Sequence, residues 1–122
     1  MSLTKRIYVL EDDEGIRDIV EMVLESEGYQ VFSFPSVSRF NEQGFNTPAD
    51  LYLLDIMLPD GNGLQVKEQL ALHPLTNRIP VLVMSAHTNN HQLENWPGEQ
   101  HFIAKPFDIY ELTGKIDSLL NA

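Results

Sequence analysis

Several residues that could do chemistry stand at or just beyond the ends of short apolar runs of this chain. These residues are Asp12 and Asp13 after the run at 7–10, Asp55 after 51–54, Ser85 after 79–84, and Lys105 after 102–104. An unpaired carboxylate is costly to bury, so such an acid belongs where the backbone leaves the core. If the runs are parallel strands, their carboxyl ends meet at one edge of the sheet, where open α/β sheets place their chemistry. We therefore expect three acids, a hydroxyl and an ammonium to converge there.

The chemistry of this set favours phosphoryl transfer with a divalent cation. Three close carboxylates repel one another unless a cation joins them, and oxygen ligands without sulfur favour Mg²⁺ or Mn²⁺. Such an ion keeps positions for water and a phosphoryl oxygen. Lys105 would bind a second phosphoryl oxygen, and the Ser85 hydroxyl would donate to a third. Asp55 is left as the nucleophile that attacks phosphorus in line.

Each residue also has a simpler interpretation when it is taken alone. Asp12 and Asp13 could cap the first helix, Ser85 could cap the segment that follows it, and Lys105 could pair with a surface acid. The joint interpretation is favoured because four predicted strands each end in a suitable residue.

The elements that must position these residues alternate along the chain. Strands are predicted over 6–10, 30–34, 51–54, 79–84 and 102–104, and helices over 14–27, 35–44, 64–72 and 108–120. This alternation predicts an α/β fold with a doubly wound parallel sheet, and right-handed crossovers put every carboxyl end on one edge. Residues 88–98 make a poor helix, with at most one short turn from 91 to 96. We expect one domain over residues 1–122.

Composition narrows the class of protein. The 122 residues suit one hydrophobic core, and the absence of cysteine excludes disulfides and thiolate metal sites. The net charge of −10, from 18 acids and 8 bases, disfavours direct nucleic-acid binding. The sequence contains no apolar run long enough to span a bilayer and no secretory signal, which predicts a cytoplasmic protein without membrane contact.

Four motifs resemble the receiver domain of two-component response regulators, in the family's order and near its spacing. They are Val9-Leu10-Glu11-Asp12-Asp13-Glu14, the segment from Leu53 to Gly61 around Asp55, Val83-Met84-Ser85-Ala86, and Ala104-Lys105-Pro106-Phe107. The resemblance covers the whole chain. It implies a flavodoxin-like (βα)5 fold with strand order 2-1-3-4-5.

The resemblance also implies roles for particular residues. Asp55 would accept a phosphoryl group from a histidine kinase or a phosphotransfer protein. Asp12, Asp13, Asp55 and the backbone carbonyl of Met57 would hold Mg²⁺, while Lys105 and Ser85 bind the phosphoryl oxygens. The Lys105-Pro106 peptide bond would be cis.

Signalling would pass through a switch pair, Ser85 and Phe102. The face made by the fourth helix, fifth strand and fifth helix would then change its preference for a downstream partner, including a second phosphorylated copy.

The chain departs from the family pattern in three places. The stretch from Ser85 to Lys105 is short and carries Trp96-Pro97-Gly98, which predicts a shortened or irregular fourth helix. Phe102 stands where tyrosine is usual, and it could equally be a core residue. In the family that the chain resembles, the positions of Met57 and His87 tune the lifetime of the phosphate. Because an apolar Met57 cannot position a water, we expect a moderately long-lived phosphoryl-aspartate.

Three functions compete. The first is a phosphoacceptor signalling domain that assists its own phosphorylation and dephosphorylation but is not a multiple-turnover enzyme. The second is a receiver-like interaction module with little phosphorylation. The third is an aspartyl-phosphate phosphatase, which needs an acid two residues after the nucleophile, where this chain has Met57. The sequence leaves open whether the chain stands alone or belongs to a longer regulator or hybrid kinase. The cognate kinase and the output are also undetermined.

Overall fold

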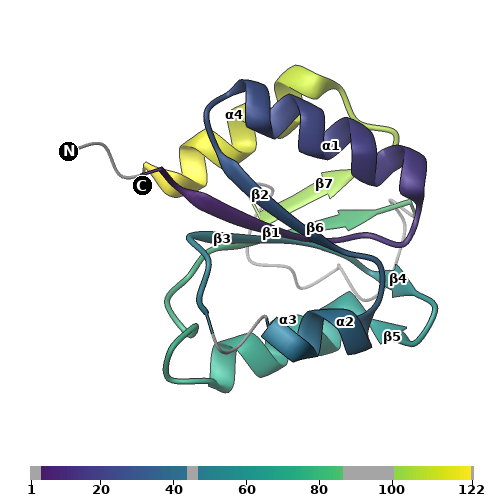
Figure 1. Cartoon of the computed structure of the whole chain (residues 1–122), viewed down its shortest axis with the longest axis vertical. Helices are drawn as coiled ribbons and strands as arrows, with labels where there is room; N and C mark the ends of the chain where they lie inside the picture. The colour runs from purple at the N-terminus through teal and green to yellow at the C-terminus, as the bar shows by residue number, and fades with distance from the viewer. Residues whose placement is uncertain (1–3, 44–46, 87–100, 122) are drawn as a thin grey trace.

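Five parallel strands form the centre of the molecule, in the order β2-β1-β3-β6-β7 (Figure 1). The computed structural model describes residues 4–43, 47–86 and 101–121. Its elements are β1 (Arg6–Leu10), α1 (Glu14–Ser26), β2 (Gln30–Phe34), α2 (Val37–Gln43), β3 (Leu51–Asp55), β4 (Met57–Leu58), β5 (Gly61–Asn62), α3 (Gly63–Leu72), β6 (Val81–Ser85), β7 (Phe102–Ala104) and α4 (Ile109–Leu120). Because β6 and β7 are the fourth and fifth strands of this sheet along the chain, the predicted order 2-1-3-4-5 is confirmed.

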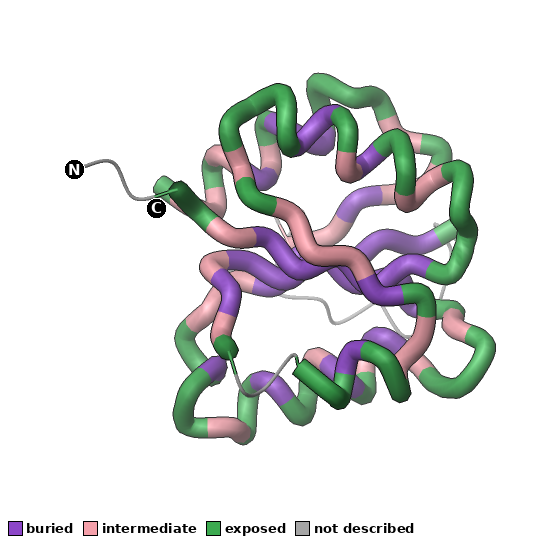
Figure 2. Tube along the Cα trace, viewed as in Figure 1, coloured by how far each residue is buried: buried purple, intermediate pink, exposed green. Residues whose placement is uncertain are grey.

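Helices cover both faces of the sheet, with α1 and α4 on one face and α2 and α3 on the other (Figure 1). Alternate side chains of each strand therefore enter different cores. On β1, Tyr8 and Leu10 pack with the α2 and α3 side, whereas Ile7 and Val9 pack with the α1 and α4 side. All residues of β3 and β6 are buried, as central parallel strands require (Figure 2).

Polar side chains begin three of the helices. Asp13, Asn62 and Asp108 each accept a hydrogen bond from a backbone N–H in the first turn of α1, α3 and α4, respectively. Gly28, at φ 93°, adopts the left-handed conformation just after α1. These caps place the start of α1 and α3 next to the carboxyl ends of β1 and β3.

Some element boundaries differ from the prediction. The strand predicted over 79–84 begins at Val81, because Pro80 lacks an N–H and the Ile79 N–H donates instead to the Thr76 carbonyl in a turn. The segment after Asp55 contains a small antiparallel hairpin, β4–β5, which lies outside the predicted strands. α2 begins at Val37 rather than at residue 35.

Two further expectations concern the fourth helix and membrane contact. The predicted irregular fourth helix over 88–98 lies outside the described residues. Within the described ranges, no helix has both the length and the apolar character that crossing a membrane requires.

Candidate functional site at the carboxyl edge of the sheet

Three carboxylates meet where β1 and β3 end. Glu11, Asp12 and Asp55 each offer an oxygen, and these oxygens all lie within 4.8 Å of one another. Glu11 is fully buried and Asp55 is 6% exposed, while Asp12 is open to solvent. Two buried acids and one exposed acid form a group that a hard cation could reach from the solvent side.

Asp13, which was expected to be a metal ligand, does not belong to this group. Its carboxylate accepts a hydrogen bond of 2.9 Å from the Ile16 N–H and caps α1. Glu11 takes the place expected for Asp13. The Glu11 N–H donates to the Phe34 carbonyl at 3.0 Å, which extends the β1–β2 pairing by one residue and keeps Glu11 beside the core.

Sequence reasoning missed Glu11 although a signal was present. Glu11 is the first residue after the apolar run of β1, just as Asp55 is the first residue after Leu51–Leu54. Applied to both strands, that rule selects Glu11 and leaves Asp13 to cap the helix.

Lys105 joins the two buried acids. Its Nζ lies 2.6 Å from Glu11 Oε1 and 3.1 Å from Asp55 Oδ2. The Lys105 backbone N–H donates to the Ser85 carbonyl at 2.7 Å, and the following bond, Lys105-Pro106, is cis. The ammonium therefore reaches across the sheet edge from β7 to β3 and β1.

The electrostatics reflect this crowding. Burial raises the pKa of Glu11 to about 7, with hydrogen bonding to Asp55 and that residue's charge acting in the same direction. Burial alone would lower the pKa of Lys105, but its hydrogen bond to Glu11 and the charge of Asp55 outweigh burial and raise that pKa. One ammonium does not fully compensate two buried carboxylates, so a further cation would favour ionised Glu11.

The remaining predicted residues are placed as follows. Ser85 ends β6, is 2% exposed and lies on the strand next to β3. The Met57 side chain is 65% exposed, and its N–H donates to Asp55 Oδ1 at 3.4 Å. Phe102 begins β7 and is half-buried rather than part of either core. His87 lies outside the described residues.

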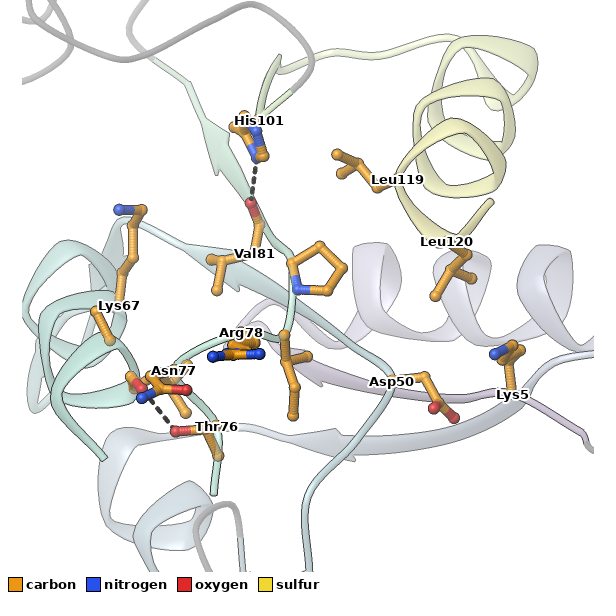
Figure 3. A pocket seen from close by; sticks show the side chains of 14 residues that line it. Lys5, Asp50, Lys67, Thr76, Asn77, Arg78, Val81, His101, Leu119 and Leu120 are labelled. Atoms are coloured by element: carbon orange, nitrogen blue, oxygen red, sulfur yellow. Dashed lines mark hydrogen bonds between the residues drawn. The ribbon is translucent and has the colours of Figure 1, made fainter. Parts of the chain in front are cut away.

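A separate hollow of about 620 Å³ lies at the opposite, amino edge of the sheet (Figure 3). It is lined by Lys5, Lys67, Arg78, His101 and Asp50, together with aliphatic side chains that include Leu119 and Leu120 of α4. None of the three clustered acids lines this hollow. The charged side chains that line the hollow are exposed or half-buried, whereas Glu11 and Asp55 at the carboxyl edge are buried. The hollow therefore lacks the buried charge that is typical of a functional site.

Comparison with known proteins identifies a family to which nearly the whole chain belongs. The chain matches the family model described as "Response regulator receiver domain" over residues 7–117. It is 37% identical to a probable transcriptional regulatory protein of Picosynechococcus sp., over 98% of this chain and 51% of that protein. The chain thus spans about half the length of the curated relatives it matches.

Solved structures agree with the fold. The non-phosphorylated HemR receiver domain of Leptospira biflexa superposes with a TM-score of 0.86 at 28% identity, covering 98% of this chain and 96% of that one. The receiver domain of a Pseudomonas aeruginosa sensor histidine kinase, with a magnesium ion coordinated in its active site cleft, superposes with a TM-score of 0.87 at 22% identity. That match covers 98% of this chain and 100% of the other. At this lower identity, the second likeness shows the fold alone.

Proposed function

The chain belongs to the response regulator receiver domain family, and from that premise we propose that Asp55 accepts a phosphoryl group from a histidine kinase or a phosphotransfer protein. The observation that carries the proposal is the bridge made by Lys105 between Glu11 and Asp55. It brings a nucleophilic carboxylate, an ammonium and a second acid together at the edge of a rigid sheet. Receiver domains are signalling domains, and we do not expect this one to turn over a substrate repeatedly.

The transfer is a displacement at phosphorus. An Asp55 carboxylate oxygen forms the new P–O bond as the bond from phosphorus to the donor breaks and its electron pair leaves with the donor. The product is an acyl phosphate on Asp55. The Asp55 backbone belongs to β3, which pairs with β1 and β6. The sheet, rather than a loop, therefore positions the nucleophilic carboxylate oxygen.

The residues present suit a divalent metal. We assign Glu11, Asp12 and Asp55 as its carboxylate ligands, in place of the expected set that included Asp13. The backbone carbonyl of Met57 remains a proposed fourth ligand. Mg²⁺, or Mn²⁺, would neutralise charge that develops on the phosphoryl oxygens.

Lys105 and Ser85 complete the phosphoryl site in this proposal. The Lys105 ammonium already touches Asp55, and it would exchange its contact with Glu11 for a phosphoryl oxygen as the group arrives. The Ser85 hydroxyl, at the end of the adjacent strand, would donate to another phosphoryl oxygen. Movement of Ser85 together with Phe102 would then alter the surface presented to a downstream output partner or a second copy.

Phosphorylation by acetyl phosphate tests the proposal. Wild-type protein incubated with acetyl phosphate and Mg²⁺ is expected to gain one phosphoryl group by intact mass, and Asp55→Asn is expected to gain none. Omitting Mg²⁺ should also prevent the gain. No gain by wild type would favour a receiver-like interaction module, whereas repeated hydrolysis of a phosphomonoester would favour a phosphatase.

A further inference from the structure

The segment after Asp55 is fastened to the fold at a point distant from its own strand. β4 and β5 pair antiparallel, with Met57 opposite Asn62 and Leu58 opposite Gly61, so Pro59 and Asp60 form the tip. A two-residue hairpin of this kind has little stability of its own. Some other contact must therefore hold its tip in place.

Asp60 makes that contact with the first turn of α2. Its Oδ1 accepts a hydrogen bond of 2.8 Å from the Val37 N–H, and its Oδ2 accepts one of 3.0 Å from the Ser38 N–H. These bonds hold the pKa of Asp60 below its usual value, the bond from Ser38 having the largest effect. Asp60 therefore stays ionised at neutral pH.

Every N–H group in the first turn of α2 has a hydrogen-bond acceptor. A helix begins with N–H groups that have no partner inside it, and here the Arg39 N–H donates to the Ser36 hydroxyl oxygen at 3.2 Å. The Phe40 N–H donates to the Ser36 carbonyl at 3.1 Å. The local cap thus serves Arg39 and Phe40, and Asp60, 22 and 23 residues away in sequence, serves Ser38 and Val37.

Close packing fixes both ends of the same segment. A Cβ on Gly61 would lie 2.8 Å from Val37 Cγ2, so the tip backbone rests against α2. At the base, the Gly63 N–H donates to the Ile56 carbonyl at 2.9 Å, and a Cβ on Gly63 would lie only 2.0 Å from the Asp55 carbonyl oxygen. The hairpin is held at its base by Asp55 and Ile56 and at its tip by α2.

We propose that Asp60 is a positioning residue, which clamps the β4–β5 hairpin to α2 and so holds the Met57 backbone beside Asp55. The part of this inference that concerns metal affinity rests on the proposed function, because Met57 is there a carbonyl ligand. The part that concerns the clamp does not, since it follows from the hydrogen bonds alone. Asp60 is not one of the proposed metal or phosphoryl ligands, and its carboxylate oxygens accept from the Val37 and Ser38 N–H groups, so its proposed action is through the backbone that it orients.

Two substitutions at Asp60 separate the clamp from simple charge. Asp60→Asn and Asp60→Ala remove the same negative charge, but asparagine keeps one acceptor oxygen for α2 and alanine keeps none. The control is Glu68→Ala, which removes an exposed acid from α3. The clamp predicts the order wild type, Asn, Ala for loosening of the hairpin, whereas an effect of charge alone predicts equal behaviour of Asn and Ala.

The measurement is amide hydrogen exchange of the metal-free protein, followed by Mg²⁺ titration calorimetry. In Asp60→Ala, exchange at Val37, Ser38 and residues 57–62 should quicken by about fivefold or more, with β1 unchanged. The Mg²⁺ dissociation constant should rise in the same order as exchange. Unchanged exchange of the hairpin in Asp60→Ala would overturn the clamp, as would equal effects of Asn and Ala. Wild-type protein that fails to bind Mg²⁺ would count against the proposed function and leave the exchange result to decide the clamp.

Discussion

The two edges of the central sheet differ in how deeply their charged side chains are buried. At the carboxyl edge, two buried acids and the Lys105 ammonium are packed within hydrogen-bonding distance, beside the exposed Asp12. At the amino edge, a hollow of about 620 Å³ is lined by basic side chains that are exposed or half-buried (Figure 3). The hollow with this volume is therefore at one edge and the buried charge at the other.

In this fold, the hollow and the cluster of buried charges do not coincide. Solvated charges at the amino edge cost little and carry no stored electrostatic energy. Buried charges at the carboxyl edge are costly unless they are paired, and such groups cluster at functional sites. The following tests address that contrast.

The largest expected effect follows from removing the buried ammonium. Lys105→Ala deprives Asp55 of its cation and the phosphoryl group of a donor, so phosphorylation by acetyl phosphate should slow about 100-fold. The matched change at the amino edge, Arg78→Ala, should leave the rate unchanged. Time courses of intact mass measure both, and an equal loss in the two variants would erase the distinction between the edges.

A backbone change at the carboxyl edge should have the next largest effect. In Gly63→Ala the added Cβ would meet the Asp55 carbonyl oxygen at 2.0 Å, so β3 or α3 must shift. We expect the free energy of unfolding to fall by about 2 kcal/mol or more. Urea denaturation measures it.

Gly114→Ala is the control for that change. Gly114 lies on α4, where an added Cβ meets nothing within 4 Å, so the substitution should raise the free energy of unfolding by about 0.5–1 kcal/mol. If Gly63→Ala were as benign, the close approach of α3 to Asp55 would not constrain the site.

A smaller effect should appear as a dependence of stability on pH. Burial raises the pKa of Glu11 from 4.5 in the unfolded chain to about 7, so between these values the folded protein binds more protons than the unfolded one. The free energy of unfolding without metal should therefore fall as pH rises from 5 to 8, by about 1–3 kcal/mol from this group.

Glu11→Gln isolates that contribution because glutamine does not titrate. Urea denaturation of the metal-free variant at pH 5 and pH 8 should give a flatter dependence than wild type. Parallel curves for the two proteins would mean that Glu11 is not held as a strained buried acid.

Much of the fold follows from local patterns in the sequence. Continuous apolar runs predicted the two central strands β3 and β6, and the alternation of strands with amphipathic segments predicted the parallel sheet. The family, which the comparisons confirm, was indicated by the resemblance of four motifs and not by this alternation. Asp108 was recognisable as a cap of α4 because capping is local. Boundaries were less predictable, since the start of β6 depends on a turn in which Ile79 bonds to Thr76.

The candidate site was predictable where a residue's role depends on its place at a strand end. Asp55 and Lys105 were found in this way, and Asp12 lies in the acidic group as expected. Glu11 was not named as a site residue, and Asp13, expected as a metal ligand, caps α1 in the structure, because nearby acids can each cap a helix or face a site. The clamp by Asp60 could not be predicted, since it joins a turn to a helix more than 20 residues away through backbone N–H groups that leave no mark in the sequence.

Nuclear magnetic resonance of the amide groups, with Mg²⁺ and beryllofluoride as a phosphoryl mimic, tests most directly whether the carboxyl edge is the site. The largest changes in chemical shift should fall on residues 11–13, 55–57, 85 and 105. Residues 76–80 and 119–120, at the hollow of the amino edge, should change least. Largest changes at the amino edge, or none near Asp55, would contradict the assignment of phosphoryl chemistry to Asp55 and the residues around it.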